Sequence, residues 1–258
     1  MSCKIKAYRK CLLAIPLAVL FHLDCFHKTE PDLIGTLNDF LIRSFFDQRT
    51  YSTDGRHALL LAFESMAIFL FFSFLWGADI YREMHTRGIY VVTRVRHKGW
   101  LIAGLVGKLA KEATVFNILY SGVTLILWKM YTKMPFNGES PFAFFLIVFF
   151  LFLVSFLLAL LVNGICIYTS VKTGSICGAF VLLAMVMEVV GYDQIPGLGR
   201  IYVLHYLNPL FLCNLFYEKS PGVVAGWLVY YIFLGLAATA IFCICVKQTE
   251  IRLVQEDR

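Results

Sequence analysis

The sequence predicts an all-α protein that crosses a membrane about six times. Of its 258 residues, 59% are hydrophobic and only 16% are charged, against about 45–50% and about 25% in soluble domains. The mean hydropathy is +0.73, and the 24 Phe, 13 Tyr and 4 Trp are too many for a disordered chain. Because a transmembrane helix needs about 20 residues, this length holds about six spans and no sizeable soluble domain.

The expected spans are apolar runs bounded by charged or turn-forming residues. The first follows four basic residues and has no small-residue cleavage site, so we expect it to remain as a helix interrupted by Pro16. The fourth is the clearest, because no charged residue occurs from Ser140 to Val171. The predicted spans form one transmembrane domain over residues 1–258, with helices at about 11–26, 57–78, 112–131, 142–167, 175–191 and 222–246.

The distribution of Lys and Arg predicts the orientation of the chain. With the N-terminus inside, the inner segments hold 15 of the 23 Lys and Arg residues, and the outer segments hold the rest. An excess of these residues marks the cytoplasmic side of a membrane protein. Both termini are therefore expected in the cytoplasm, and the net charge of +6 is attributed to this rule and not to nucleic-acid binding.

A charged connection separates the second and third spans, over residues 79–111. It mixes basic residues with Ile, Val, Tyr and Trp, as expected for a helix at the cytoplasmic interface with its cations at the lipid headgroups. The same mixture suits a short helix docked on a cytoplasmic partner. The alternative is an ordinary positive inner loop.

The connection between the fifth and sixth spans, residues 192–221, is apolar but interrupted by Pro and Gly. Backbone at membrane depth must have its polar groups satisfied internally, so a broken apolar segment cannot simply cross. We therefore expect a re-entrant helical segment on the outer side, with breaks at Pro196 and Pro209. The alternative is an amphipathic outer loop with no role in transport.

Two carboxylates and one amide lie inside the predicted spans. Glu64 and Glu188 are costly at membrane depth, by about 2.5–3.5 kcal/mol for an acidic residue at a helix centre. They are expected either to line a substrate pathway or to pair locally, for example with Lys129 or Arg56. Asn163 is interpreted as either a pathway residue or an interhelical hydrogen-bonding group.

The two connections, on opposite sides of the membrane, resemble those of ABC-2-type ABC transporter permeases, and the resemblance covers essentially the whole chain. In that family the inner connection reads acidic, Gly, Arg and a distal Lys, and the outer one carries Pro breaks and an Asn-Pro pair. The matching residues here are Glu83, Gly88, Arg94, Lys108, Pro196, Asn208 and Pro209. One departure is Thr86-Arg87-Gly88 in place of the more usual Gly-Thr order.

The resemblance implies a permease subunit of an ATP-driven transporter in a bacterial inner membrane. Two permease subunits, identical or related, would form the pathway, and two cytoplasmic ABC ATPase subunits would bind ATP and Mg. A coupling helix within Asp79–Lys98, with Asp79 and Arg82 in it, would take up the ATPase movement. Export of an amphipathic, peptide or lipid-like substrate is the expected activity, including antimicrobial-peptide export or immunity.

The motifs of several enzyme classes are absent from the sequence. There is no G-x-x-x-x-G-K-[ST], so ATP hydrolysis is expected on another subunit. There is also no HExxH and no G-x-S-x-G. No metal site is expected, because the spacing of His22, Asp24, Cys25 and His27 fits no standard zinc pattern. The alternative function is a polytopic membrane enzyme or scaffold without an ATPase partner.

Overall fold

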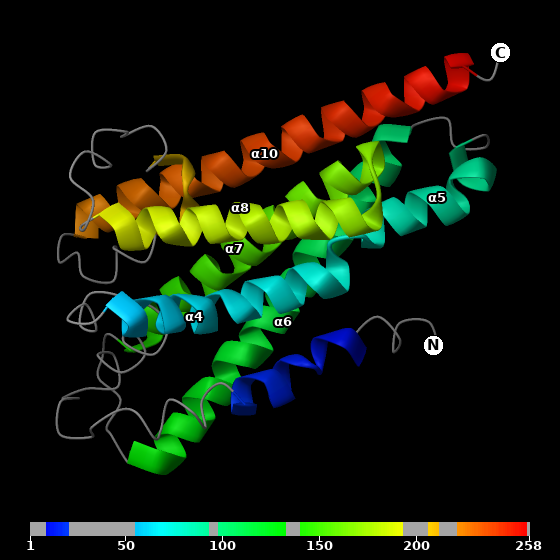
Figure 1. Ribbon diagram of the computed structural model, residues 1–258. Helices are drawn as coiled ribbons and strands as arrows, with labels where there is room; N and C mark the ends of the chain where they lie inside the picture. The colour runs from blue at the N-terminus through cyan, green and yellow to red at the C-terminus, as the bar shows by residue number, and fades with distance from the viewer. Residues whose placement is uncertain are drawn as a thin grey trace.

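The protein is helical over almost all of the part that its computed structural model describes, which comprises residues 9–20, 55–92, 98–132, 140–192, 206–211 and 221–256. This confirms the all-α prediction for those residues. Short helical stretches occur within 9–20 and 206–211. The longer helices are α4 (Gly55–Trp76), α5 (Asp79–Val92), α6 (Lys98–Thr132), α7 (Ser140–Tyr168), α8 (Val171–Tyr192) and α10 (Pro221–Glu256) (Figure 1).

Three helices of the described part are long and apolar enough to cross a membrane. These segments are Pro141–Tyr168, Val171–Glu188 and Gly222–Lys247, and each is at least as long as the roughly 17 residues that the shortest span requires. They lie within α7, α8 and α10. The chain is therefore a membrane protein by the length and composition of these helices.

Helix α7 is the centre of the helical packing. Helices α4, α6, α8 and α10 all contact it, and its side chains Ile147, Phe150, Ala159 and Val162 are buried. Helix α7 also has the most apolar composition of the three candidate spans. A helix that is hydrophobic on all sides is expected in the interior of a bundle.

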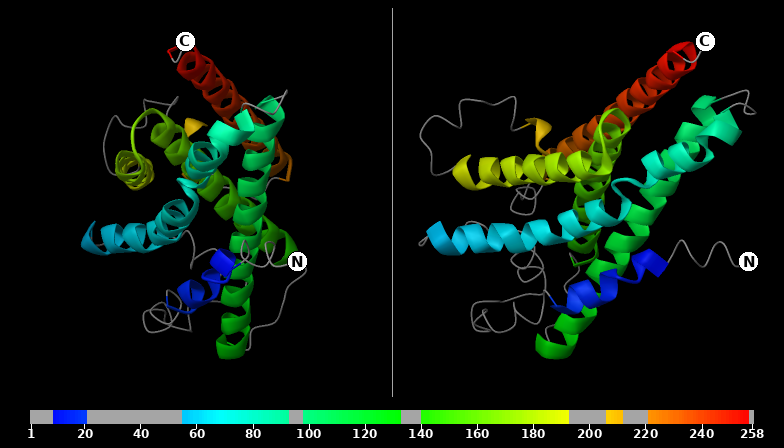
Figure 2. Two further views of the ribbon diagram at one scale, coloured as in Figure 1. Left: turned by 90° about the vertical axis from the view of Figure 1, so that its right-hand side faces the viewer. Right: turned by 45° about the vertical axis from the view of Figure 1, so that its right-hand side comes forward.

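The helices run back and forth between two ends of the molecule. One of these ends lies toward the right of Figure 1. It holds the end of α4, all of α5, the starts of α6 and α8, the end of α7 and the C-terminal end of α10. Residues 9–20 start at this end too and lie beside α6, on the side away from α10 (Figure 2). Helix α5 therefore lies where several helix ends meet.

Glycines allow α7 and α8 to approach closely. Gly174 and Gly178 are one turn apart on α8, and a Cβ on either would collide with Cys166 or Val162 of α7. Such pairs of small residues four apart are typical of close helix contacts in membranes. Gly77, just after α4, also faces Val162 without room for a Cβ. One short stretch of α7 thus packs against glycines from two other segments.

Two helices extend beyond the predicted spans. The sequence predicts a third span from about residue 112, but α6 begins at Lys98, and α10 continues to Glu256 rather than ending near 246. The physical reason is that hydropathy marks where the hydrocarbon region ends, while Lys, Glu, Gln and Arg remain good helix formers in water. A transmembrane helix can therefore continue into the aqueous phase.

The N-terminal stretch has a break before Pro16. Residues 9–11 and 14–20 are helical, with a turn at 12–13, where the Leu13 N–H donates to Lys10 O at 3.1 Å. A proline ring collides with the carbonyl four residues earlier in a regular helix, and for Pro16 that residue is Leu12. The predicted remainder of this helix, to about residue 26, lies outside the described residues.

Candidate functional site

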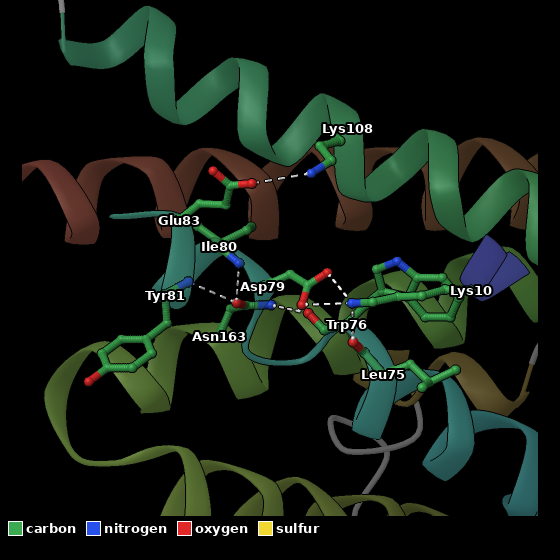
Figure 3. A network of polar contacts seen from close by, with 9 residues as sticks. All are labelled: Lys10, Leu75, Trp76, Asp79, Ile80, Tyr81, Glu83, Lys108 and Asn163. Carbon is green, nitrogen blue, oxygen red and sulfur yellow. Dashed lines mark hydrogen bonds and ion pairs between the residues drawn. The ribbon is translucent and has the colours of Figure 1, made fainter. Parts of the chain in front are cut away.

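The candidate site is the corner between Trp76, where α4 ends, and Asp79, where α5 begins (Figure 3). At this turn the first N–H groups of α5 and the last carbonyl groups of α4 lack partners within their own helices. The Gly77 N–H donates to Ser73 O, and the Arg82 N–H donates to Ala78 O at the start of α5. The N–H groups between these two residues need acceptors from elsewhere.

Asn163 of α7 supplies bonds to both sides of the corner. Its Oδ1 accepts from the N–H groups of Ile80 at 2.9 Å and Tyr81 at 3.2 Å. Its Nδ2 donates to Trp76 O at 3.0 Å (Figure 3) and to Ala159 O at 2.8 Å. The side chain is fully buried. A single amide therefore holds the end of α4 and the start of α5 against α7.

Lys10 ties the N-terminal stretch to the same corner. Its Nζ lies 2.7 Å from Asp79 Oδ2 and 3.0 Å from Asp79 Oδ1, and it donates to Leu75 O at 3.0 Å. The ammonium also lies 5.6 Å from the centroid of the Trp76 ring, within range of a cation–π attraction. Asp79 is in the first turn of α5, where a negative charge interacts favourably with the helix dipole.

A second ion pair joins α5 to α6. Lys108 Nζ lies 3.5 Å from Glu83 Oε1 (Figure 3). The acidic residue and the distal lysine of the predicted coupling motif are thus in contact. Because both side chains are partly exposed, the pair contributes at most about 1 kcal/mol. The pair therefore links α5 to α6 but contributes little to stability.

Beneath the corner lies a cluster of buried aromatic rings. Trp76 stacks on Phe72 with centroids 4.5 Å apart and meets Phe116 of α6 edge-on at 5.5 Å. Glu112 of α6 is also buried, with 6% of its surface exposed, and its backbone O faces the Cys11 thiol at 3.8 Å. The corner therefore rests on a tightly packed support.

Other predicted site residues lie at the opposite end of the bundle. Asn208 Nδ2 donates to Glu188 Oε2 at 3.1 Å and to Met185 O at 2.9 Å. Asn208 O accepts from the Tyr231 hydroxyl at 3.2 Å, and Pro209 starts the short turn that follows. The structure thus joins Glu188 to the Asn-Pro pair, and it separates Glu188 from Asn163.

The remaining predicted site residues are only partly described. Arg82 is an exposed residue of α5 and Gly88 lies farther along the same helix. Glu64 lies within α4, but its side chain is not among those described. Arg94 and Pro196 fall outside the described residues, as do His22, Asp24, Cys25 and His27. Within the described part, no group of three His, Cys, Asp or Glu side chains could hold a metal ion.

Sequence reasoning did not single out three residues of the corner. Lys10 counted only as one of the inner positive charges, and Trp76 and Glu112 received no role. The contact of Lys10 with Asp79 spans 69 positions, and no local spacing reveals such a pair. The one available signal was Glu112 itself, a carboxylate directly before the charge-free run 113–128 of α6.

Comparison with protein-family models, with curated proteins and with solved structures found no match.

Proposed function

We propose that the chain is the membrane-spanning permease subunit of an ATP-driven transporter of the ABC-2 type. The observation that best supports this is the fixation of α5 at its first turns. Asn163, Lys10 and Lys108 hold it from α7, the N-terminal stretch and α6. A short helix attached to so many others is suited to pass a movement into the bundle.

Helix α5 has the two faces that a coupling helix needs. Ile80 has only 2% of its surface exposed, whereas Arg82 and His85 are exposed. The polar face would dock in a groove of a cytoplasmic ABC ATPase, where ATP and Mg bind and hydrolysis takes place. Displacement of α5 would then pull on the end of α4 through Asn163 and on the start of α6 through the Glu83–Lys108 pair.

The proposed topology has six spans and both termini in the cytoplasm of a bacterial cell. The first span would be the stretch 9–20 with the residues after it. The other five would be α4, α6, α7, α8 and α10, in that order. The outer segment with Pro196, Asn208 and Pro209 would be re-entrant between the last two. Charged α5 and Lys172 would then lie inside, in agreement with the excess of positive residues on that side.

The proposed activity is export of an amphipathic, peptide or lipid-like substrate, as in antimicrobial-peptide export or immunity, through a pathway formed with a second permease subunit. Glu64 and Glu188 remain candidate pathway residues, since carboxylates inside spans usually face protein or a polar path. For Asn163, four hydrogen bonds to protein atoms support a positioning role at the corner instead.

The test is purification of the tagged full-length chain from its native membrane in mild detergent. We expect it to copurify with a protein that carries G-x-x-x-x-G-K-[ST] and with ATP hydrolysis. Glu83→Lys should uncouple hydrolysis from the permease, and the exchange Glu83→Lys with Lys108→Glu should restore part of the coupling. Lys172→Glu, a charge reversal outside the α4–α5 corner, is the matched control.

Persistent absence of such an ATPase, with the chain intact and monodisperse, would refute the proposal. In that case a polytopic membrane enzyme or scaffold becomes the better description.

A further inference from the structure

An apolar groove of about 670 Å³ runs along α7 between α8 and α10. Leu157, Leu161 and Ile165 of α7 line it, together with Met185 of α8 and Phe242 of α10. Helices α8 and α10 both pack on α7 and leave this part of its surface between them. The groove is formed by the same three helices that are apolar enough to cross a membrane.

The length and setting of the groove suit a hydrocarbon chain. It follows α7 from Val154 to Tyr168, which at about 1.5 Å per residue is roughly 21 Å, or about two-thirds of the roughly 30 Å hydrocarbon core. Its rim is accessible, since Leu161 is 40% and Ile241 is 61% exposed. A lipid chain can therefore enter sideways from the bilayer.

One end of the groove is polar. Glu188 and Asn208 line it there, and within the described part Glu188 is the single charged side chain on its wall. Asn208 is 97% buried and donates to Glu188 Oε2 at 3.1 Å, so the carboxylate is held at the end of the groove. An ionised carboxylate only accepts hydrogen bonds and has about four lone-pair sites, so it can serve more than one donor.

We propose that this groove binds a membrane lipid, with one acyl chain along α7 and an ammonium-bearing headgroup at Glu188. The carboxylate attracts an ammonium group and repels an anionic headgroup. The groove walls also favour a chain over a helix, because interfaces between membrane helices are rich in small residues. Here the wall residues are mainly Leu, Ile, Val, Met and Phe, with a single glycine, Gly164. Glu188 is also a candidate pathway residue of the proposed transport function, but lipid binding in this groove requires neither an ATPase nor transport.

The test uses the purified full-length chain in nanodiscs that contain a trace of photoactivatable lipid with a diazirine in its acyl chain. One sample contains the phosphatidylethanolamine probe and the other the phosphatidylglycerol probe, in the same background lipid. We expect the ethanolamine probe to label residues 157–165 and 241–245. It should do so roughly tenfold more than the glycerol probe, a ratio that corresponds to about 1.4 kcal/mol.

Two variants separate the chain from the headgroup. Gly164→Leu places a side chain in the groove next to the Phe242 ring, which lies 3.6 Å from the position that a Cβ would take there, and should remove most labelling by both probes. Gly122→Leu on α6 is the control, because nothing lies within 4 Å of its Cβ position. Glu188→Gln should keep groove labelling but abolish the preference for the ethanolamine probe. This variant tests the role of Glu188 in headgroup binding even if Gly164→Leu fails to fold.

Three results would overturn the proposal. The first is unchanged groove labelling in a folded Gly164→Leu protein. The second is labelling of the exposed residues Phe233 and Leu236 as strong as that of the groove, since this indicates ordinary surrounding lipid. The third is an equal response to both probes in the wild type.

Discussion

The side chain of Asn163 accepts a hydrogen bond from the backbone N–H of Ile80 at 2.9 Å, across 83 positions of sequence. The same amide donates to the backbone of Trp76. One side chain from α7 therefore joins the end of α4 to the start of α5. Proteins seldom leave buried backbone groups unpaired, so this residue is essential to the geometry of the corner.

We expect Asn163→Ala to destabilise the protein. Loss of the amide leaves the N–H groups of Ile80 and Tyr81 without their acceptor, at a cost of about 1–3 kcal/mol per buried group. The apparent melting temperature of the detergent-solubilised protein, followed by circular dichroism, should fall by several degrees. Asn163→Asp keeps the acceptor but buries a charge, so it should not restore stability.

Ser155→Ala is the matched control on the same helix. Ser155 is fully buried, and its hydroxyl has no hydrogen-bond partner among the described residues. Removal of such a hydroxyl should be neutral or slightly stabilising. Equal effects of the two alanine substitutions would contradict the role assigned to Asn163.

Lys10→Met should detach the N-terminal stretch from the corner. The substitution removes the ion pair with Asp79 and the bond to Leu75 O, while the apolar part of the side chain remains. Cys11 has no exposed surface, so its reaction with maleimide reports separation of this stretch from α6. We expect the rate at which Cys11 reacts with maleimide, measured by peptide mass spectrometry, to rise several-fold.

Arg9→Met serves as the control for Lys10, because Arg9 is exposed and its replacement removes the same charge from the same stretch. If Cys11 reacts equally fast in both variants, net charge and not the contact with Asp79 determines the docking.

Gly178→Ala should destabilise the packing of α7 on α8. A Cβ at this position collides with Val162, and overpacking of a core commonly costs about 1–3 kcal/mol. The double variant with Val162→Ala should recover part of the loss. We would measure the melting temperature of both variants in the same detergent.

Gly104→Ala on α6 should raise the melting temperature, the opposite of the effect expected for Gly178→Ala. Nothing lies within 4 Å of its Cβ position, and alanine is about 1 kcal/mol more favourable than glycine in a helix. A loss of stability at Gly104 equal to that at Gly178 would show that the contact with Val162 is not the cause.

The six-span topology predicts opposite accessibilities for two exposed lysines. Cysteine in place of Lys129, at the end of α6, should react with an impermeant maleimide only from the outside. Cysteine in place of Lys172, at the start of α8, should react only in inverted vesicles. Reaction of both from one side would exclude the proposed crossing by α7 between them.

The general architecture could be read from the sequence because hydrophobicity is a local property. The charge-free run around α7 and the apolar runs of α8 and α10 are visible without any structure. The spacing of Gly174 and Gly178, four residues apart, is also visible in the sequence. Only the structure shows that they pack against Val162 and Cys166 of α7. Helix ends such as Lys98 and Glu256 were less predictable, since a helix need not end where the membrane does.

The candidate site was predictable only in part. Asp79, Glu83, Lys108 and Asn163 stood out by type and position, because charged and polar residues are rare in this chain. The sequence by itself determined that the chain is helical and suited to a membrane, since burial in lipid requires long apolar helices. Only the tertiary structure decided that Asn163 holds Ile80 and that Lys10 pairs with Asp79, because such contacts depend on which helix faces meet, and no local pattern encodes that.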